Sequence, residues 1–204
     1  MMLTTVPFLS SAIASLIATA APSTEIIPFD RPSCASPAHP CLTQVSSQTH
    51  ANPAYGFQFE YPAGFAIETE SEQLIETQSH VQIYTSEDYR ALQQGTLYEP
   101  GRFIEVSAYE NPDRLSAQEW SVQNSPQSNL DPARPNDVDA IRVAGQAAIA
   151  FSWCGMFCGD SVVFTNGDRN VVVVVAIIDA APADPVRAAF EQILNTFQFV
   201  DSDA

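Results

Sequence analysis

The sequence predicts an α+β protein, a sandwich in which helices pack on a central antiparallel sheet. Three observations lead to this fold class. Short strand patterns are joined by tight turns, which is typical of β-hairpins. Residues 171–175 are five consecutive valines, so this strand is apolar on both faces and is expected in the middle of a covered sheet. The last helical segment carries an apolar stripe that fits against such a sheet.

The first half of the domain contains four strand segments, at residues 56–61, 65–69, 80–85 and 103–109. Residues 56–61 alternate large apolar and polar side chains, which is the pattern of a half-buried strand. Only Pro62, Ala63 and Gly64 separate the first two segments, so we expect them to pair as a hairpin.

Two short helices are predicted in the middle of the chain. Ser86 is expected to cap a helix over residues 87–94, which ends at Gly95. Ser116 and Glu119 have the spacing of a capping box, which opens the second helix. The Pro- and Asn-rich residues 125–136 that follow are predicted to form a long loop.

The C-terminal third gives the clearest pattern. Residues 140–143 and 147–153 are predicted to form one hairpin, and residues 161–165 and 170–178 another. The second hairpin turns at Asn166-Gly167, a pair that accepts the positive φ of a tight turn.

A final helix is predicted to start with Asp184 as its N-cap and Pro185 in its first turn. Its apolar residues fall on one stripe: Val186, Ala189, Phe190, Ile193, Leu194 and Phe197. Such a stripe could also serve a cofactor, but a face packed on the core is the better interpretation.

The chain is strongly acidic, with 24 Asp and Glu against 8 basic residues, all of them Arg, and a net charge of -16. This charge repels phosphate backbones and anionic lipids, so we expect neither nucleic-acid binding nor strong binding to membrane surfaces. The absence of Lys excludes Schiff-base chemistry and a P-loop. Solubility explains the acidity, and binding of a cation or a basic partner is the alternative. We expect a monomer.

The ends of the chain differ from the domain. Residues 1–20 read as a signal peptide, with small residues before a cleavage site after Ala20, although no Lys or Arg precedes the apolar run. An uncleaved anchor is the alternative. Export would bring the protein to a periplasm, the extracellular space or a thylakoid lumen. Residues 21–53 form a Pro/Ser/Thr-rich linker, residues 54–200 the domain, and residues 201–204 an acidic tail.

Four cysteines, Cys34, Cys41, Cys154 and Cys158, permit three pairings, and proximity in sequence favours the Cys34–Cys41 and Cys154–Cys158 disulfides. Two alternatives concern the second pair. Trp153 and the residues after it resemble a thioredoxin motif, but three residues separate these cysteines instead of two, and a strand follows instead of a helix. A zinc site would need paired Cys-X-X-Cys spacing or a nearby His.

No catalytic residue is predicted. His39, His50 and His80 have no partner at a spacing suited to metal binding or proton transfer, and no nucleophile elbow is present. A hydrolase triad would have to be assembled by the fold around His80.

No cofactor is predicted either, and calcium is the only one considered. Acidic groups occur at residues 68–72, 137 and 139, and 201 and 203, but they lack the glycine turn and the ligand spacing of an EF-hand. Solvated loops are the better interpretation of these groups.

Three stretches together are similar to the PsbP-like superfamily. Residues 55–65 contain a Gly-Phe-X-Phe-X-Tyr-Pro run, residues 115–120 resemble the start of the family's second helix, and residues 193–199 resemble its closing helix-to-strand segment. The resemblance implies an α/β/α sandwich and non-enzymatic accessory work, because members assist photosystem II in oxygenic phototrophs and relatives bind other proteins. Members that dock on photosystem II rely partly on lysines, which this chain lacks.

The function predicted is therefore that of an exported, non-catalytic accessory module that contacts a protein or a small ligand through surface loops. The candidate contact residues are Gly155, Met156 and Phe157, with the loop at residues 125–136 as a second candidate. The alternative is an envelope thiol-disulfide oxidoreductase or metal-binding protein that uses Cys154 and Cys158.

Overall fold

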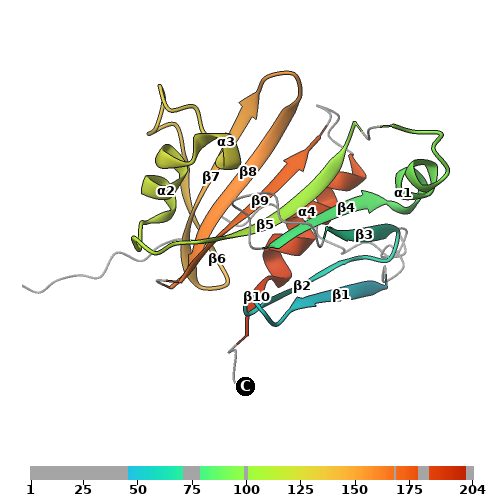
Figure 1. The fold of residues 1–204 in the computed structure, drawn as a ribbon, viewed down its shortest axis with the longest axis horizontal. Coiled ribbons are helices and arrows are strands. Elements are labelled where there is room, and N and C mark those ends of the chain that lie inside the picture. The colour runs from blue at the N-terminus through green and yellow to red at the C-terminus, as the bar shows by residue number, and fades with distance from the viewer. Residues whose placement is uncertain (1–45, 71–78, 99–100, 168, 179–183, 201–204) are drawn as a thin grey trace, which may run out of the picture. The chain divides into compact units, whose positions relative to one another are not determined.

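Seven antiparallel strands form the central sheet of the protein, in the order β3-β4-β5-β9-β8-β7-β6 (Figure 1). The computed structural model describes residues 46–70, 79–98, 101–167, 169–178 and 184–200, which all lie in one compact unit, Leu42–Ala204. The strands are β3 (Phe65–Glu70), β4 (Ser79–Thr85), β5 (Phe103–Glu110), β6 (Asp139–Val143), β7 (Gln146–Cys154), β8 (Cys158–Asn166) and β9 (Asn170–Ile177). The valine-rich strand β9 lies in the middle and is buried on both faces, as predicted.

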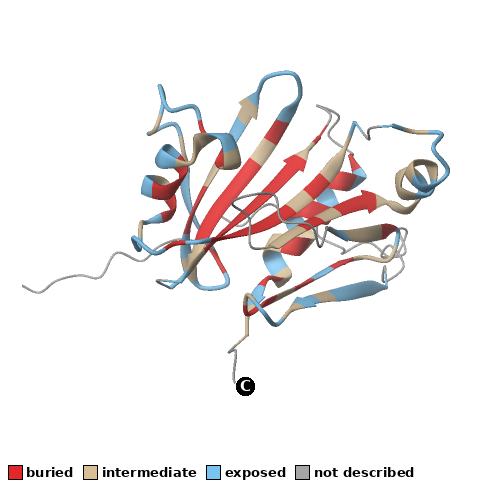
Figure 2. Cartoon of the chain, in the orientation of Figure 1, coloured by how far each residue is buried: buried red, intermediate tan, exposed pale blue. Residues whose placement is uncertain are grey.

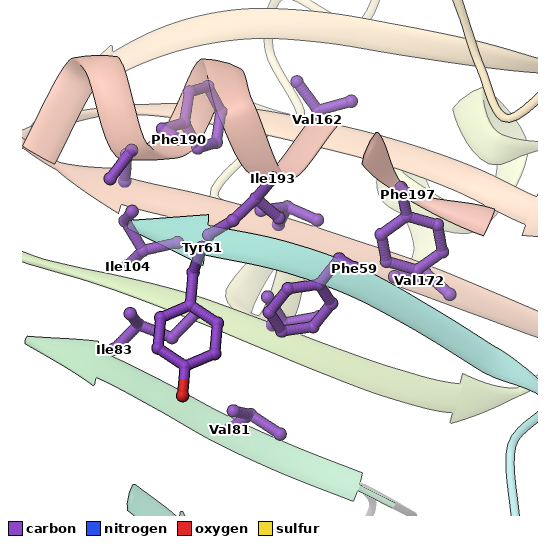
Figure 3. Packing of buried hydrophobic residues seen from close by; sticks show 14 of the residues in the cluster. Phe59, Tyr61, Val81, Ile83, Ile104, Val162, Val172, Phe190, Ile193 and Phe197 are labelled. Carbon is purple, nitrogen blue, oxygen red and sulfur yellow. The ribbon is translucent and has the colours of Figure 1, made fainter. Parts of the chain in front are cut away.

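One face of this sheet is covered by helix α4 (Pro185–Thr196) and by a small antiparallel sheet. The small sheet consists of β1 (Ser47–Asn52), β2 (Phe57–Pro62) and β10 (Gln198–Phe199), with β2 in the middle. Figure 3 shows Phe59 of β2 and Ile193 of α4 packed with Ile104 and Val172 of the central sheet. Asp184 caps α4 through a hydrogen bond from the Val186 amide, 2.9 Å, as the sequence predicts.

On the other face of the central sheet, the described helices cover only part of the strands. Helices α2 (Ala117–Gln123) and α3 (Ser125–Ser128) lie over β7, β8 and β9, where Trp120 packs against Tyr109 with a ring-centroid distance of 4.9 Å. Helix α1 (Ser86–Gln93) lies beside β3 and β4 at the far end of the sheet (Figure 2). Helices thus lie on both faces of an antiparallel sheet, which confirms the predicted α+β sandwich.

Three local predictions are wrong. Residues 65–69 do not pair back on residues 56–61, because both edges of β2 are already occupied by β1 and β10, and β3 joins the central sheet instead. Thr85, not Ser86, caps α1, since its Oγ1 accepts the Asp88 amide at 3.1 Å and Ser86 is already helical. The predicted loop at 125–136 begins with the helical turn α3.

The predicted boundary between linker and domain also needs correction. Residues 47–52, which we assigned to the linker, form β1 and pair along the whole of β2. The predicted linker up to residue 45, with Cys34, Cys41 and His39, lies outside the described residues, as do the predicted signal peptide and the acidic tail. In the ranges that are described, no helix combines the length and apolar character that a membrane span requires.

Candidate functional site

The tip of the β7–β8 hairpin is closed by a disulfide between Cys154 and Cys158. These two residues face each other as the last pair of the antiparallel ladder, and only Gly155, Met156 and Phe157 lie between them. The Gly155 amide donates a hydrogen bond of 2.7 Å to the Phe157 carbonyl across the loop. The predicted Cys154–Cys158 disulfide is thus present, and we call residues 154–158 the disulfide tip.

The disulfide tip exposes apolar side chains to solvent. Met156 is 92% exposed and Phe157 is 37% exposed, and the loop stands out at the top of Figure 2. In the described part of the chain, three other large hydrophobic residues are exposed: Tyr98, Val122 and Ile141. Adjacent exposed apolar residues on a constrained loop are typical of an interaction site, whereas scattered ones are not.

The base of the tip is held by side-chain contacts from three elements. Asp160 accepts a hydrogen bond of 2.7 Å from the Ser152 hydroxyl and an ion pair of 3.0 Å from Arg187 on α4. On the same hairpin, the Trp153 indole N–H donates to the Ser161 hydroxyl at 2.9 Å. These contacts, with the disulfide, fix the direction in which the tip projects from the sheet.

Close packing at the base also explains a glycine. A Cβ on Gly159 would lie 2.6 Å from the Ala176 carbonyl oxygen and 2.8 Å from the Trp153 ring, so no larger residue fits without displacing backbone. The sequence Trp-Cys-Gly-Met-Phe-Cys-Gly therefore places its second glycine under the indole.

The tip does not have the setting of a redox or zinc site. Catalytic cysteines of the thioredoxin type lie at a helix N-terminus, which lowers the thiol pKa, whereas Cys154 ends one strand and Cys158 begins the next. Both sulfurs are consumed by the disulfide, so neither is a thiolate ligand for a metal.

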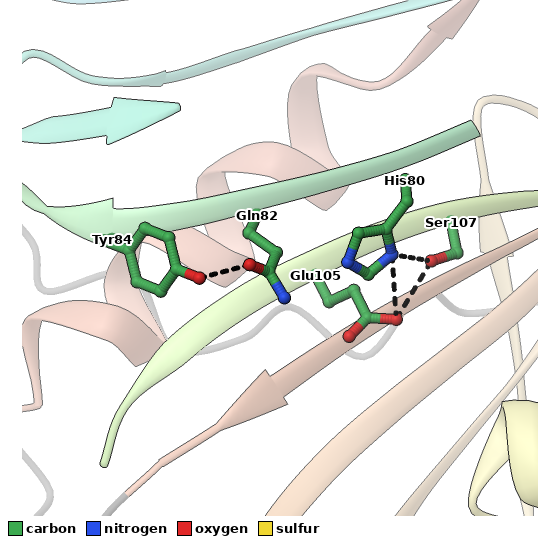
Figure 4. A network of polar contacts seen from close by, with 5 residues as sticks. All are labelled: His80, Gln82, Tyr84, Glu105 and Ser107. Atoms are coloured by element: carbon green, nitrogen blue, oxygen red, sulfur yellow. Dashed lines mark hydrogen bonds and ion pairs between the residues drawn. The ribbon is translucent and has the colours of Figure 1, made fainter. Parts of the chain in front are cut away.

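The structure brings together one set of polar residues that the sequence did not reveal. His80 Nδ1 on β4 lies 3.0 Å from Ser107 Oγ and 3.5 Å from Glu105 Oε1, both on β5, and the Ser107 hydroxyl donates to Glu105 at 3.0 Å (Figure 4). Strand pairing opposes His80 to Ser107, which no motif in the sequence indicates.

These three residues do not have the geometry of a catalytic triad. In a triad the hydroxyl and the carboxylate contact different nitrogens of the imidazole. Here both contact Nδ1, and Ser107 is buried on the sheet face. The set is a polar network that satisfies the partly buried His80 side chain.

His50, which we placed before the domain, lies on β1. Its ring centroid is 5.2 Å from that of Phe59, and its Nε2 is buried without a hydrogen-bond partner among the described residues. Burial lowers the pKa of His50. The side chain is therefore an apolar contact of the small sheet rather than a ligand or a base.

The remaining sequence candidates are weaker. Within the described ranges, no group of three or more His, Cys, Asp or Glu residues is placed to hold a metal ion. Asp137 lies 3.8 Å from Arg134 in an ion pair. The loop at 125–136 is partly buried through Leu130, and Gln118 of α2 donates to its Pro135 carbonyl at 2.9 Å. It therefore offers less exposed apolar surface than the disulfide tip.

Comparison with known proteins bears on the fold. No protein-family model matches the chain, and no curated protein is significantly similar to it in sequence. Its structure is similar to that of cyanobacterial PsbP (CyanoP) from Synechocystis sp. PCC 6803, with a TM-score of 0.50 and 17% identity over 80% of this chain and 99% of that chain. A Bacteroides thetaiotaomicron VPI-5482 structure matches at a TM-score of 0.43 and 8% identity, over 75% of this chain and 48% of that chain. The protein has a divergent PsbP-like fold.

Proposed function

We propose that the chain is an exported accessory module that binds a protein partner through its disulfide tip and performs no catalysis itself. The observation that carries the proposal is the pair of exposed apolar side chains, Met156 and Phe157, on a loop fixed by the Cys154–Cys158 disulfide. A disulfide at this position also fits an oxidising compartment outside the cytoplasm.

The PsbP-like fold supports the accessory role and gives it a setting. Members of that superfamily assist photosystem II, so we propose that the partner belongs to a photosynthetic membrane complex and that the protein works in a thylakoid lumen or periplasm. Because the chain has no Lys, it cannot use the lysine contacts of members that dock on photosystem II. An apolar tip supplies another way to dock: a few buried apolar anchors contribute most of the binding energy in protein interfaces.

The proposal is tested by site-specific photocrosslinking of the protein in its own cells. A benzophenone amino acid replaces Met156, and in a matched control it replaces Ile141, which is equally apolar and is exposed on the edge strand β6. We expect a discrete crosslinked product from position 156 that is absent from position 141 and is weakened by Phe157→Ser.

Two outcomes separate the parts of the proposal. The same products from both positions, or none from position 156, would exclude the tip as a docking site. A single partner unrelated to photosynthesis would support the tip as the docking site but exclude the photosynthetic setting.

A further inference from the structure

The half of the central sheet that α2 and α3 leave open carries a row of polar side chains. Strand alternation turns Val81 and Ile83 of β4 into the core, so Gln82 and Tyr84 point to the opposite face. Cross-strand pairing aligns Glu68 of β3, Gln82 of β4 and Glu105 of β5 in one row on that face.

A hollow of about 460 Å³ lies over this part of the sheet. Its floor and walls come from β3, β4, β5, α1 and the turn after α1, and its lining residues are Glu68, Gln82, Tyr84, Leu92, Gln93, Tyr98 and Phe103. A volume of a few hundred Å³ is in the range of small-ligand sites. The hollow is remote from the disulfide tip, since β3–β5 and the β7–β8 hairpin lie on different sides of β9.

Aromatic rings supply the apolar part of the hollow. Tyr84 and Phe103 lie with ring centroids 5.8 Å apart, and Tyr84 stacks on Tyr89 of α1 at 6.3 Å. The Tyr84 hydroxyl donates to Gln82 Oε1, which fixes the ring against the sheet (Figure 4). The faces of such rings attract organic cations through their quadrupoles.

Among the described residues that line the hollow, the one charged residue is acidic. Glu68 lines it, and Glu105 lies in the same row two strands away, about 10 Å from Glu68 given the usual spacing of strands. No Arg is among the lining residues, and the nearby Arg102 turns toward Asp184, with 3.9 Å between Nη1 and Oδ1. Carboxylates beside aromatic rings form a site complementary to a guanidinium or ammonium group.

We propose that this hollow binds an organic cation, either a free amine or the side chain of an arginine or lysine. Glu68 supplies the charge, and the half-buried Phe103 and the exposed Tyr98 supply the aromatic surface, while the buried Tyr84 ring packs against Phe103. The acidity of the chain, with a net charge of -16, strengthens the attraction at long range.

The test is a titration followed by NMR chemical shifts of the full domain. The probes are N-acetyl-arginine methylamide and its citrulline analogue, which has the same shape but no charge. We expect saturable shifts at residues of the hollow with the arginine probe and not with citrulline. Glu68→Gln should weaken arginine binding about three- to tenfold, the effect of losing a single favourable charge contact.

The matched control is Glu110→Gln, which removes the same charge from an exposed position at the other end of β5. We expect it to leave the affinity unchanged. Equal binding of citrulline or of a neutral sugar, an equal loss in both variants, or no saturation at tens of millimolar probe would overturn the proposal. Agmatine and the peptide Gly-Gly-Arg-Gly-Gly distinguish the sources: preference for agmatine assigns a free amine, and equal or tighter peptide binding assigns a protein side chain.

Discussion

Phe197 joins the layers of the protein, and truncating it provides the strictest test of the core. The residue ends α4, directly precedes β10 and is 3% exposed. Its ring centroid lies 4.9 Å from that of Phe164 on the central sheet, 5.4 Å from Phe57 and 5.5 Å from Phe199 on the small sheet. One side chain at the end of α4 thus contacts both the central sheet and the small sheet.

The expected cost of Phe197→Ala follows from these contacts. Replacing a buried Phe by Ala costs about 3–5 kcal/mol, because apolar burial is lost and a cavity remains. Four aromatic rings contact Phe197, and each is anchored on a paired strand: Phe57, Phe59, Phe164 and Phe199. We therefore expect a loss of about 4 kcal/mol, which is less than the roughly 5–15 kcal/mol that stabilises an ordinary domain.

Urea unfolding monitored by tryptophan fluorescence measures this loss. With an m-value of about 2 kcal/mol/M, the midpoint should fall by about 2 M while m stays constant. Phe157→Ala is the matched control, because it makes the same chemical change on the exposed tip and should shift the midpoint by less than about 0.5 M. A Phe197→Ala shift as small as that of the control would refute a single core shared by these layers.

Three further predictions concern single residues. Burial lowers the pKa of His50, so below about pH 6.5 the unfolded chain binds a proton that the folded chain does not, and stability falls on acidification. His50→Leu should therefore reduce the fall in urea midpoint between pH 7 and pH 5. An unchanged fall would contradict the burial of a neutral His50. Gly159→Ala should cost about 1–3 kcal/mol by urea unfolding, because its Cβ would meet the Ala176 carbonyl oxygen at 2.6 Å, and a neutral effect would disprove this packing. Ser116→Ala removes the N-cap of α2 and should cost about 1 kcal/mol in the same assay, whereas Ser116→Asp should retain most of the stability.

Local signals in the sequence predict much of this fold. The caps Ser116 and Asp184 and the turn at Ala144-Gly145 form through contacts within a few residues, so the chain carries them in short motifs. The central position of β9 could be predicted because only a strand covered on both faces tolerates an unbroken valine run. The disulfide followed from proximity in sequence, and the exposed tip followed from the disulfide.

Long-range pairing could not be predicted in the same way. β1 is exposed along most of its length, so its sequence lacks the apolar alternation that predicts a half-buried strand. Only its pairing with β2 identifies it as a strand. The missing hairpin between residues 56–61 and 65–69 has the same cause, because β10, from the far end of the chain, occupies the edge of β2 that β3 would need. The row of Glu68, Gln82 and Glu105 consists of ordinary polar positions on three strands, and only their register brings them together.

Both proposed surfaces follow from a mismatch between the central sheet and the helices on its α2 face. Seven strands at the usual spacing span about 30 Å, whereas α2 has 7 residues and is about 10 Å long, and α3 has only 4 residues. Such short helices cover β7–β9 and leave β3–β5 open. The open half of the face therefore carries polar side chains, and α1, at the end of this half, forms one wall of the hollow. The tip arises at the other side of the sheet because β7 and β8 extend for 9 residues each, beyond what the helices cover. The disulfide, the Asp160 contacts and the Trp153–Ser161 hydrogen bond then hold the end of the hairpin. An apolar anchor and an acidic, aromatic hollow on opposite halves of one sheet are therefore separate sites, and a substitution in one should leave binding at the other unchanged.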